Sequence, residues 1–150
     1  ADIDAGRVVY VHDGSNTTSD SFDFEVTDGD ILFPAQSGTF DFNITLINDA
    51  PLSADNATTI DEDTDYTFNI GDFAFRDPND LVANTFQAVR IVTTPANGQL
   101  VLDPGASVTG VVAAGQYIDV ADIPFLRYVP AANGNGLGYG TFTFQVQDDG

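Results

Sequence analysis

The chain has no cysteine, methionine or tryptophan among its 150 residues, and it has only four basic residues and one histidine. Without cysteine there is no disulfide framework and no thiol chemistry. No run approaches the roughly 18 apolar residues of a membrane-spanning helix, and no charged-then-apolar leader opens the chain. We therefore expect neither membrane insertion nor an export signal within this sequence.

Few residues suit catalysis. His12 has no partners that would make it part of a catalytic triad. Its motif, Tyr10-Val-His12-Asp-Gly14, resembles one in the C-terminal half of CSPG/NG2-like repeats, and this resemblance implies that His12 orders a turn. Only Glu25 and Glu62 are glutamates, and tryptophan is absent, which argues against a cleft of paired carboxylates lined by aromatic rings. The sequence therefore predicts a protein that is not an enzyme.

Acidic residues dominate the charge. Twenty-three acids face four arginines, for a net charge of −19, and 21 of the acids are aspartate. A charged helix would use the better helix former glutamate freely, whereas aspartate prefers turns and is a common ligand of hard cations on loops. The excess therefore indicates turns, calcium or both. Nucleic acid and anionic membranes are poor partners for such a surface.

The apolar residues follow a β pattern. Val, Ile, Phe and Tyr outnumber Leu, and apolar side chains alternate at Phe22/Phe24/Val26, at Phe40/Phe42/Ile44/Leu46 and at Phe142/Phe144/Val146. Gly, Asn and Asp turn signals separate such segments. We predict an all-β, Greek-key sandwich. The predicted strands are 7–12, 20–27, 39–47, 57–60, 65–70, 88–94, 99–102, 116–120, 125–129 and 140–147.

The sequence contains an internal repeat. Residues 1–3 (Ala-Asp-Ile) return at 121–123, and Phe22-Asp-Phe-Glu-Val-Thr-Asp28 returns as Phe142-Thr-Phe-Gln-Val-Gln-Asp148, both at a spacing of 120 positions. Arg7-Val-Val-Tyr-Val11 corresponds to Arg127-Tyr-Val129 with a two-residue slip. Such spacing is typical of tandem arrays.

The phase of this repeat divides the chain. Residues 1–49 correspond to the end of one unit, and residues 50–150 to a unit that lacks its last strand, with the boundary at Asn48-Asp49-Ala50-Pro51. We therefore expect both termini to fall inside repeats. A sheet edge without its last strand could accept a strand from another chain, so a strand-exchanged dimer is a further expectation.

Several motifs carry a family resemblance. Residues 2–15 followed by Ser19-Asp20-Ser21-Phe22 resemble the C-terminal half of a CSPG/NG2-like repeat, and Asn48-Asp49-Ala50-Pro51 resembles the linker that closes cadherin-like repeats. Asp61-Glu62-Asp63-Thr64, Phe73-Ala-Phe-Arg-Asp-Pro78, residues 95–100 and residues 142–150 resemble bacterial tandem cadherin-like repeats of large secreted adhesins. The Asp-Arg-Glu motif of classical cadherins is absent, so their ligand set cannot be transferred position by position.

The resemblance implies that the Greek-key sandwich is immunoglobulin-like or cadherin-like. It also implies Ca²⁺ at inter-repeat junctions and a secreted or cell-surface protein of bacteria that serves in adhesion or extension. The candidate calcium ligands are Asp28, Asp30, Asn48, Asp49, Glu62, Asp63, Asp77, Asp80, Asp148 and Asp149. We expect Asp148 and Asp149 to serve the next junction and the others the junction at the linker. Ordinary turn-forming aspartates are the alternative reading.

Two functions follow. In the first, the chain is a calcium-rigidified structural or adhesive repeat whose partners are neighbouring repeats or, through homophilic contacts, other copies. In the alternative it is a calcium-dependent polysaccharide-binding module, with Tyr117 or Tyr139 stacking on a sugar ring.

Overall fold

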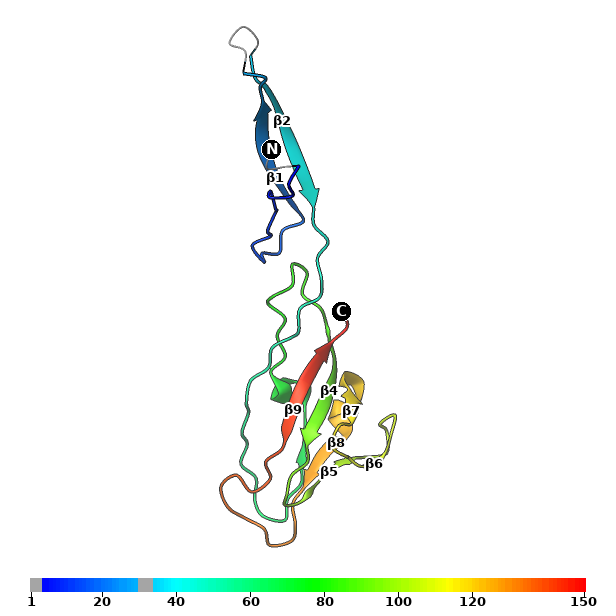
Figure 1. The fold of residues 1–150 in the computed structure, drawn as a ribbon. Coiled ribbons are helices and arrows are strands. Elements are labelled where there is room, and N and C mark those ends of the chain that lie inside the picture. Colours follow the sequence, from blue (N-terminus) through cyan, green and yellow to red (C-terminus); the bar gives the residue numbers. More distant parts are fainter. Residues whose placement is uncertain (1–3, 30–33) are drawn as a thin grey trace. The chain divides into compact units, whose positions relative to one another are not determined.

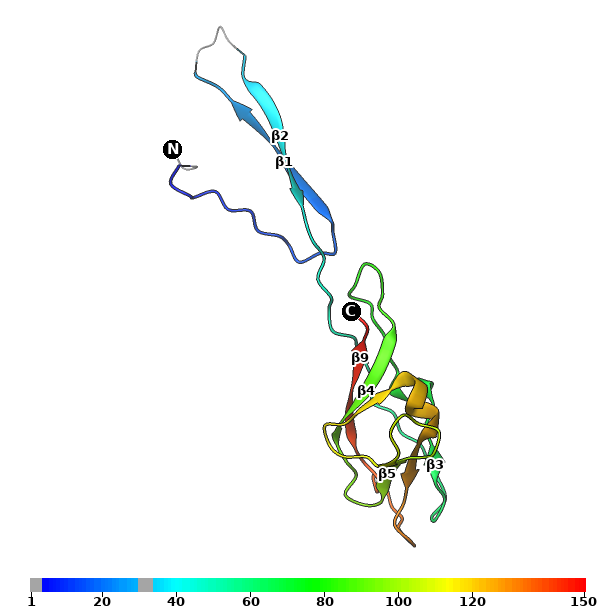
Figure 2. The ribbon, with the colours of Figure 1, turned by 90° about the vertical axis from the view of Figure 1, so that its right-hand side faces the viewer.

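The computed structural model describes residues 4–29 and 34–150, which form two compact units, Ala1–Ile47 and Asn48–Gly150. This division lies two residues before the boundary predicted from the repeat. Asp30 lies outside the described residues. Each unit is described by itself below, and Figures 1 and 2 show the elements of both.

The first unit is built on one β-hairpin. Strand β1 (Ser19–Val26) pairs with β2 (Gln36–Asn43) in antiparallel register, from Ser19 opposite Asn43 to Val26 opposite Gln36. Because alternate residues of a strand point to one face, their phenylalanines gather on one side of the hairpin. Phe22 stacks on Phe40 at 5.6 Å between ring centroids, and Phe40 is 51% exposed. The aromatic face of this hairpin is therefore largely uncovered.

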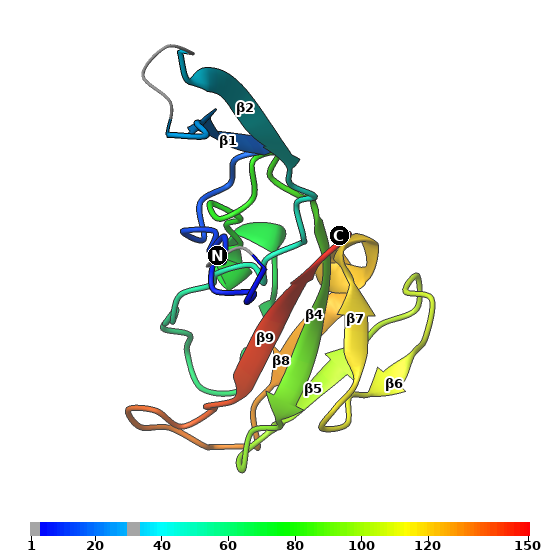
Figure 3. The same cartoon turned by 45° about the horizontal axis from the view of Figure 1, so that its top comes forward.

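The second unit is a sandwich of two antiparallel sheets, visible in Figure 3. One sheet has the order β7-β4-β9, and the other has the order β3-β8-β5-β6. The strands are β3 (Tyr66–Thr67), β4 (Phe86–Thr93), β5 (Gln99–Leu102), β6 (Gly110–Val111), β7 (Tyr117–Asp119), β8 (Leu126–Val129) and β9 (Thr143–Asp148). Two 3-10 helices, η1 (Ile70–Phe73) and η2 (Val120–Phe125), complete it. The mostly-β, antiparallel architecture confirms the predicted fold class and is consistent with a cadherin-like sandwich.

The core lies between the two sheets. Its fully buried side chains are aliphatic apart from one phenylalanine: Phe73, Val89, Ile91, Leu100, Ile118, Ile123 and Leu126. They come from inward positions of β4, β5, β7 and β8 and from both 3-10 helices. In η1, Asn69 caps the first turn by accepting a hydrogen bond from the Gly71 amide, which fixes the turn that delivers Phe73 to the core.

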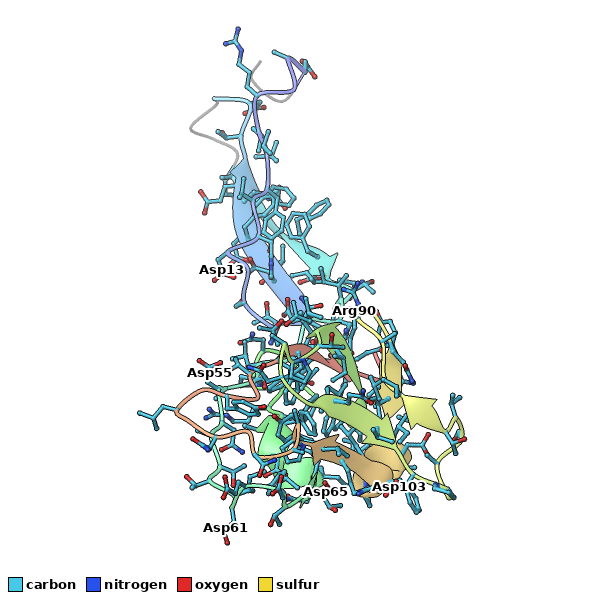
Figure 4. All side chains as sticks on the ribbon, turned by 90° about the horizontal axis from the view of Figure 1, so that it is seen from below. Asp13, Asp55, Asp61, Asp65, Arg90 and Asp103 are labelled. Atoms are coloured by element: carbon cyan, nitrogen blue, oxygen red, sulfur yellow. The ribbon has the colours of Figure 1, made fainter. Side chains whose placement is uncertain are left out.

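An ion-pair group ties the β3–β8–β5 side of the second unit together. The Arg127 guanidinium on β8 donates to both carboxylate oxygens of Asp103, at 2.6 and 2.8 Å, and also to Asp65. Figure 4 labels the two aspartates. This bidentate bond lowers the pKa of Asp103 below its ordinary value, since a positive donor favours the ionised carboxyl.

Most predicted strands form, and Gln99–Leu102 has the predicted bounds. The prediction was wrong at 7–12 and 57–60, which contain no strand, and it missed β6. Neither segment pairs with a strand among residues 4–29 and 34–150, although both have suitable residues. No helix among residues 4–29 and 34–150 is long and apolar enough to cross a membrane.

Candidate functional site

Three segments of the second unit meet at one end of the sandwich, where β9 finishes (Figure 1). They are the linker residues Asn48 and Asp49, the loop from Asp77 to Thr85, and residues 148–150, which begin with the last residue of β9. We call this group of residues the linker-end cluster. The structure thus brings Asn48, Asp49, Asp77 and Asp80 together at one end of the unit, as expected from the sequence.

Two carboxylates of this cluster are buried. Asp77 is 8% exposed and Asp148 is 5% exposed. Oδ2 of Asp77 accepts a hydrogen bond from the Asn84 amide, and Oδ1 of Asp148 accepts one from Asn48 Nδ2 at 3.3 Å. The amide side chain of Asn84 in turn contacts Oδ1 of Asn48 at 2.7 Å. A polar chain therefore runs from Asp77 to Asp148.

Each buried carboxylate leaves one oxygen without a partner. Oδ1 of Asp77 and Oδ2 of Asp148 are buried and make no hydrogen bond. A buried charged oxygen that loses its hydration without replacement is costly, and native proteins pair such groups or use them as metal ligands. These two oxygens are the strongest sign of a ligand in the described residues.

Further carboxylates surround this pair. Asp80 accepts from the Asp49 backbone amide at 3.1 Å, which fixes the linker to the 77–85 loop. Asp149 accepts from the backbone amide and the hydroxyl of Thr85, at 2.7 and 2.6 Å. The hydroxyl bond, followed by the backbone bond, lowers the pKa of Asp149.

The donor set fits a hard cation. Every candidate ligand atom at this end is a carboxylate or amide oxygen, which calcium prefers over nitrogen or sulfur. Among residues 4–29 and 34–150, however, no three acidic or histidine side chains converge as a ready-made metal centre. A cation here would therefore use the two unpartnered oxygens together with amide or backbone oxygens and a reoriented side chain such as Asp80.

Glu62 and Asp63 are not part of the linker-end cluster, so the grouping expected from the sequence was wrong. Both are exposed, and they contact the turn before β9: Glu62 Oε2 accepts from Asn135 Nδ2 at 3.3 Å, and Asp63 Oδ1 from the Asn133 amide at 2.7 Å. That turn precedes the start of β9, whereas Asp148 ends it. The segment after the linker runs along the sandwich instead of starting a strand at the linker end (Figure 1).

The expected position of Asp148 was also wrong, whereas the position of Asp28 relative to the linker-end cluster stays a prediction. Asp148 contacts Asn48 itself and so lies at the linker end, with Asp149, instead of at a further junction. Asp28 follows the last β1–β2 pair, Val26 with Gln36, while the linker leaves the hairpin beyond Asn43 at the opposite end. Eight paired residues, roughly 25 Å of strand, separate the two ends of the hairpin.

Two cluster members were missed. Asn84 and Thr85 lie just before the predicted strand 88–94 and were not among the candidate ligands, yet Asn84 contacts Asn48 and Asp77, and Thr85 binds Asp149. Asn and Thr at a strand start are such common turn residues that their type carries little signal.

The residues considered for other roles lie elsewhere. The His12 ring accepts a hydrogen bond from the Gly14 amide at 3.2 Å, in keeping with its predicted role in a turn. Tyr117 is 58% exposed, and the Arg90 guanidinium lies over its ring at 5.9 Å. Tyr139 lines a groove on the second unit that Tyr117 does not reach. The two tyrosines therefore do not form one stacking platform.

Residues 1–46 match the family model described as cadherin-like. The match covers the hairpin of the first unit, and residues 47–150 are not assigned to any family. No solved structure matches the chain. Cadherin-like domains are usually extracellular, often bind calcium and are typically non-catalytic.

Proposed function

We propose that the chain is a calcium-binding structural or adhesive repeat of a large secreted or cell-surface protein. In this proposal, residues 1–49 are the C-terminal part of a CSPG/NG2-like repeat, and residues 50–150 are a cadherin-like repeat of bacterial adhesin type. The cadherin-like match of residues 1–46 supports an adhesive or structural module. The observation that carries the calcium assignment is the pair of buried carboxylate oxygens, on Asp77 and Asp148, that have no partner.

Calcium would act here by linking three segments. Asp77 and Asp148 would each supply their unpartnered oxygen, Asn48 its amide oxygen, and Asp80 or Asp149 a further carboxylate. The cation would neutralise carboxylates that otherwise repel one another at one end of a chain of charge −19. It would also hold the linker residues against the 77–85 loop and the end of β9, and thereby restrict hinge motion at the linker.

Thermal unfolding with and without calcium tests this proposal. A cation that binds only the folded chain stabilises it by about 2.7 kcal/mol at one hundred times its dissociation constant. We expect the midpoint of unfolding of the second unit to rise by roughly 10–20 °C in millimolar calcium and to return to its starting value with EGTA. Magnesium should do less, because it demands a tighter octahedral shell. An unchanged midpoint in calcium would refute the proposal.

A further inference from the structure

The second unit contains three asparagines that are followed by glycine. Asn133-Gly134 and Asn135-Gly136 lie in the loop between β8 and β9, and Asn97-Gly98 lies in the turn between β4 and β5 (Figure 1). In such a pair the glycine nitrogen can attack the side-chain carbonyl of the asparagine, because glycine has no Cβ in the way. The attack also requires a free glycine amide and an asparagine side chain that can turn toward it. The three pairs differ in both respects.

Asn133-Gly134 is restrained on both sides. The Gly134 amide donates to the Ala131 carbonyl at 3.0 Å, which closes a β-turn. The Asn133 amide donates to Oδ1 of Asp63 at 2.7 Å. The Tyr139 hydroxyl lies so close to Gly134 that a Cβ would not fit there. The attacking nitrogen of this pair is therefore already bonded, and the backbone around it cannot rotate freely.

Asn97-Gly98 is restrained by its neighbours. Nδ2 of Asn97 donates to the Tyr139 carbonyl at 3.2 Å, and the Asn97 carbonyl accepts from the Tyr128 hydroxyl at 2.9 Å. Gly98 has no space around it, since a Cβ there would lie 2.5 Å from the Val129 carbonyl oxygen. Ring closure must move both the side chain and the backbone of this pair, so these contacts oppose it.

Asn135-Gly136 has neither kind of restraint. In the part of the chain that the structure describes, the Gly136 amide makes no hydrogen bond, and a Cβ at Gly136 would meet no atom within 4 Å. Both residues are exposed. Nδ2 of Asn135 makes long contacts, 3.3 Å to Oε2 of Glu62 and 3.5 Å to the Asn133 carbonyl, which exceed the usual length of an N–H···O bond. The nitrogen is free, and the side chain is only weakly held.

We propose that Asn135 is a site of spontaneous deamidation in the folded protein. The Gly136 nitrogen attacks Cγ of Asn135, and a bond forms between these two atoms. The bond from Cγ to Nδ2 breaks, and Nδ2 leaves as ammonia with the proton that the Gly136 amide gives up. Water then opens the cyclic imide at either carbonyl, which yields aspartate or isoaspartate. The reaction involves no redox change, and water is its only co-reactant.

Deamidation reverses the contact between Asn135 and Glu62. The asparagine donates a hydrogen bond to the Glu62 carboxylate, whereas a carboxylate at position 135 has no proton to donate and repels Glu62. The same segment is attached to this loop through Asp63 and the Asn133 amide. The modification should therefore loosen the attachment of residues 61–63 to the loop between β8 and β9.

Peptide mapping of the wild-type protein by mass spectrometry tests the site. The folded chain is incubated at mildly alkaline pH, and the conversion of each of the three asparagines is followed with time. Asn135 should convert about tenfold faster than Asn133 or Asn97, since freeing a hydrogen-bonded amide slows the reaction by roughly that factor. In urea the three rates should become similar, because the restraints are lost. Equal rates in the folded chain, faster conversion of Asn133 or Asn97, or no conversion would overturn the proposal.

Two variants test the consequence. Asn135→Gln keeps an amide that can donate to Glu62 but would have to close a larger, less favourable ring, so it should remove the early release of ammonia. Asn135→Asp has the charge of one reaction product. Its unfolding midpoint should lie below that of Asn135→Gln at low ionic strength, and the difference should shrink in high salt, which screens exposed charges. Equal midpoints at low ionic strength would show that the added charge does not loosen the loop.

Discussion

Removing one buried charge should make the apo protein more stable while abolishing its response to calcium. The variant Asp77→Asn keeps an oxygen to accept from the Asn84 amide and replaces the unpartnered Oδ1 with a neutral group. In the absence of calcium, wild type bears the cost of a buried, unpaired charged oxygen, and the variant does not. In the presence of calcium, wild type gains a ligand-bound site, and the variant has lost one of its anchors.

The magnitudes are large enough to measure. An unsatisfied buried polar group costs about 1–3 kcal/mol. The asparagine side chain of the variant is itself imperfectly paired, so we expect the free energy of unfolding of Asp77→Asn to exceed that of wild type by only about 1 kcal/mol without calcium. For a unit of this size that gain corresponds to roughly 4–8 °C. Saturating calcium should raise the unfolding midpoint of wild type by roughly 10–20 °C and leave the midpoint of the variant nearly unchanged. The order of stabilities therefore reverses when calcium is added.

Differential scanning calorimetry in EGTA and in calcium measures this reversal. Asp148→Asn should behave in the same way, since its Oδ2 is the other unpartnered oxygen. The matched control is Asp55→Asn, which removes the same charge from an exposed position that is not part of the linker-end cluster. Figure 4 labels Asp55. Parallel shifts for Asp77→Asn and wild type in both conditions would refute the reasoning, because they would show that the buried oxygen neither costs stability nor binds calcium.

Three further predictions concern the fold of the second unit. Arg127 lowers the pKa of Asp103 in the folded chain, so the ionised carboxylate stabilises the fold fully at pH values above its ordinary pKa of 3.8, and this stability is lost as the pH falls through the lowered pKa. The variant Arg127→Gln should therefore flatten the acid side of a curve of unfolding free energy against pH, measured by urea unfolding. Gly98→Ala should destabilise the fold by about 2 kcal/mol or more, because φ is +78° and a Cβ would lie 2.5 Å from a β8 carbonyl oxygen. The control Gly115→Ala, at φ +85° with open space around it, should cost about 1 kcal/mol in the same assay. Equal costs would show that the carbonyl clash at Gly98 does not matter. Phe73→Ala should cost about 3–5 kcal/mol by chemical denaturation, since the ring is 1% exposed, and a loss below 1 kcal/mol would show that the core closes over the gap.

The local pattern of the sequence predicts the strands that have a neighbour. The alternation at Phe22, Phe24 and Val26 finds its partner in β2, and Gln99–Leu102 lies between β8 and β6. Residues 57–60 have equally good strand composition and form none. A strand requires a second backbone for its hydrogen bonds, and the presence of that backbone is a non-local property that no short window of sequence contains.

The candidate site was predictable in its residue types and only partly in its grouping. The linker residues and the Asp77–Asp80 loop were among the residues assigned to one junction, and Asp80 does accept a hydrogen bond from the Asp49 amide. The position of Asp148 depends on the direction in which β9 runs, which the sequence does not show. The position of Glu62 depends on how far the chain extends along the sandwich after the linker, which the sequence does not show either. Burial is likewise a tertiary property: nothing near Asp77 in sequence shows that this aspartate, unlike Asp61 or Asp63, is enclosed.

Direct measurement of bound calcium tests the central claim most sharply. Equilibrium dialysis of the intact chain against labelled calcium should give at least one ion per chain, and Asp77→Asn and Asp148→Asn should each lower that number while Asp55→Asn leaves it unchanged. Wild-type protein that binds no calcium at millimolar concentration, or binds it equally well in all three variants, would contradict a site built on the two buried carboxylates.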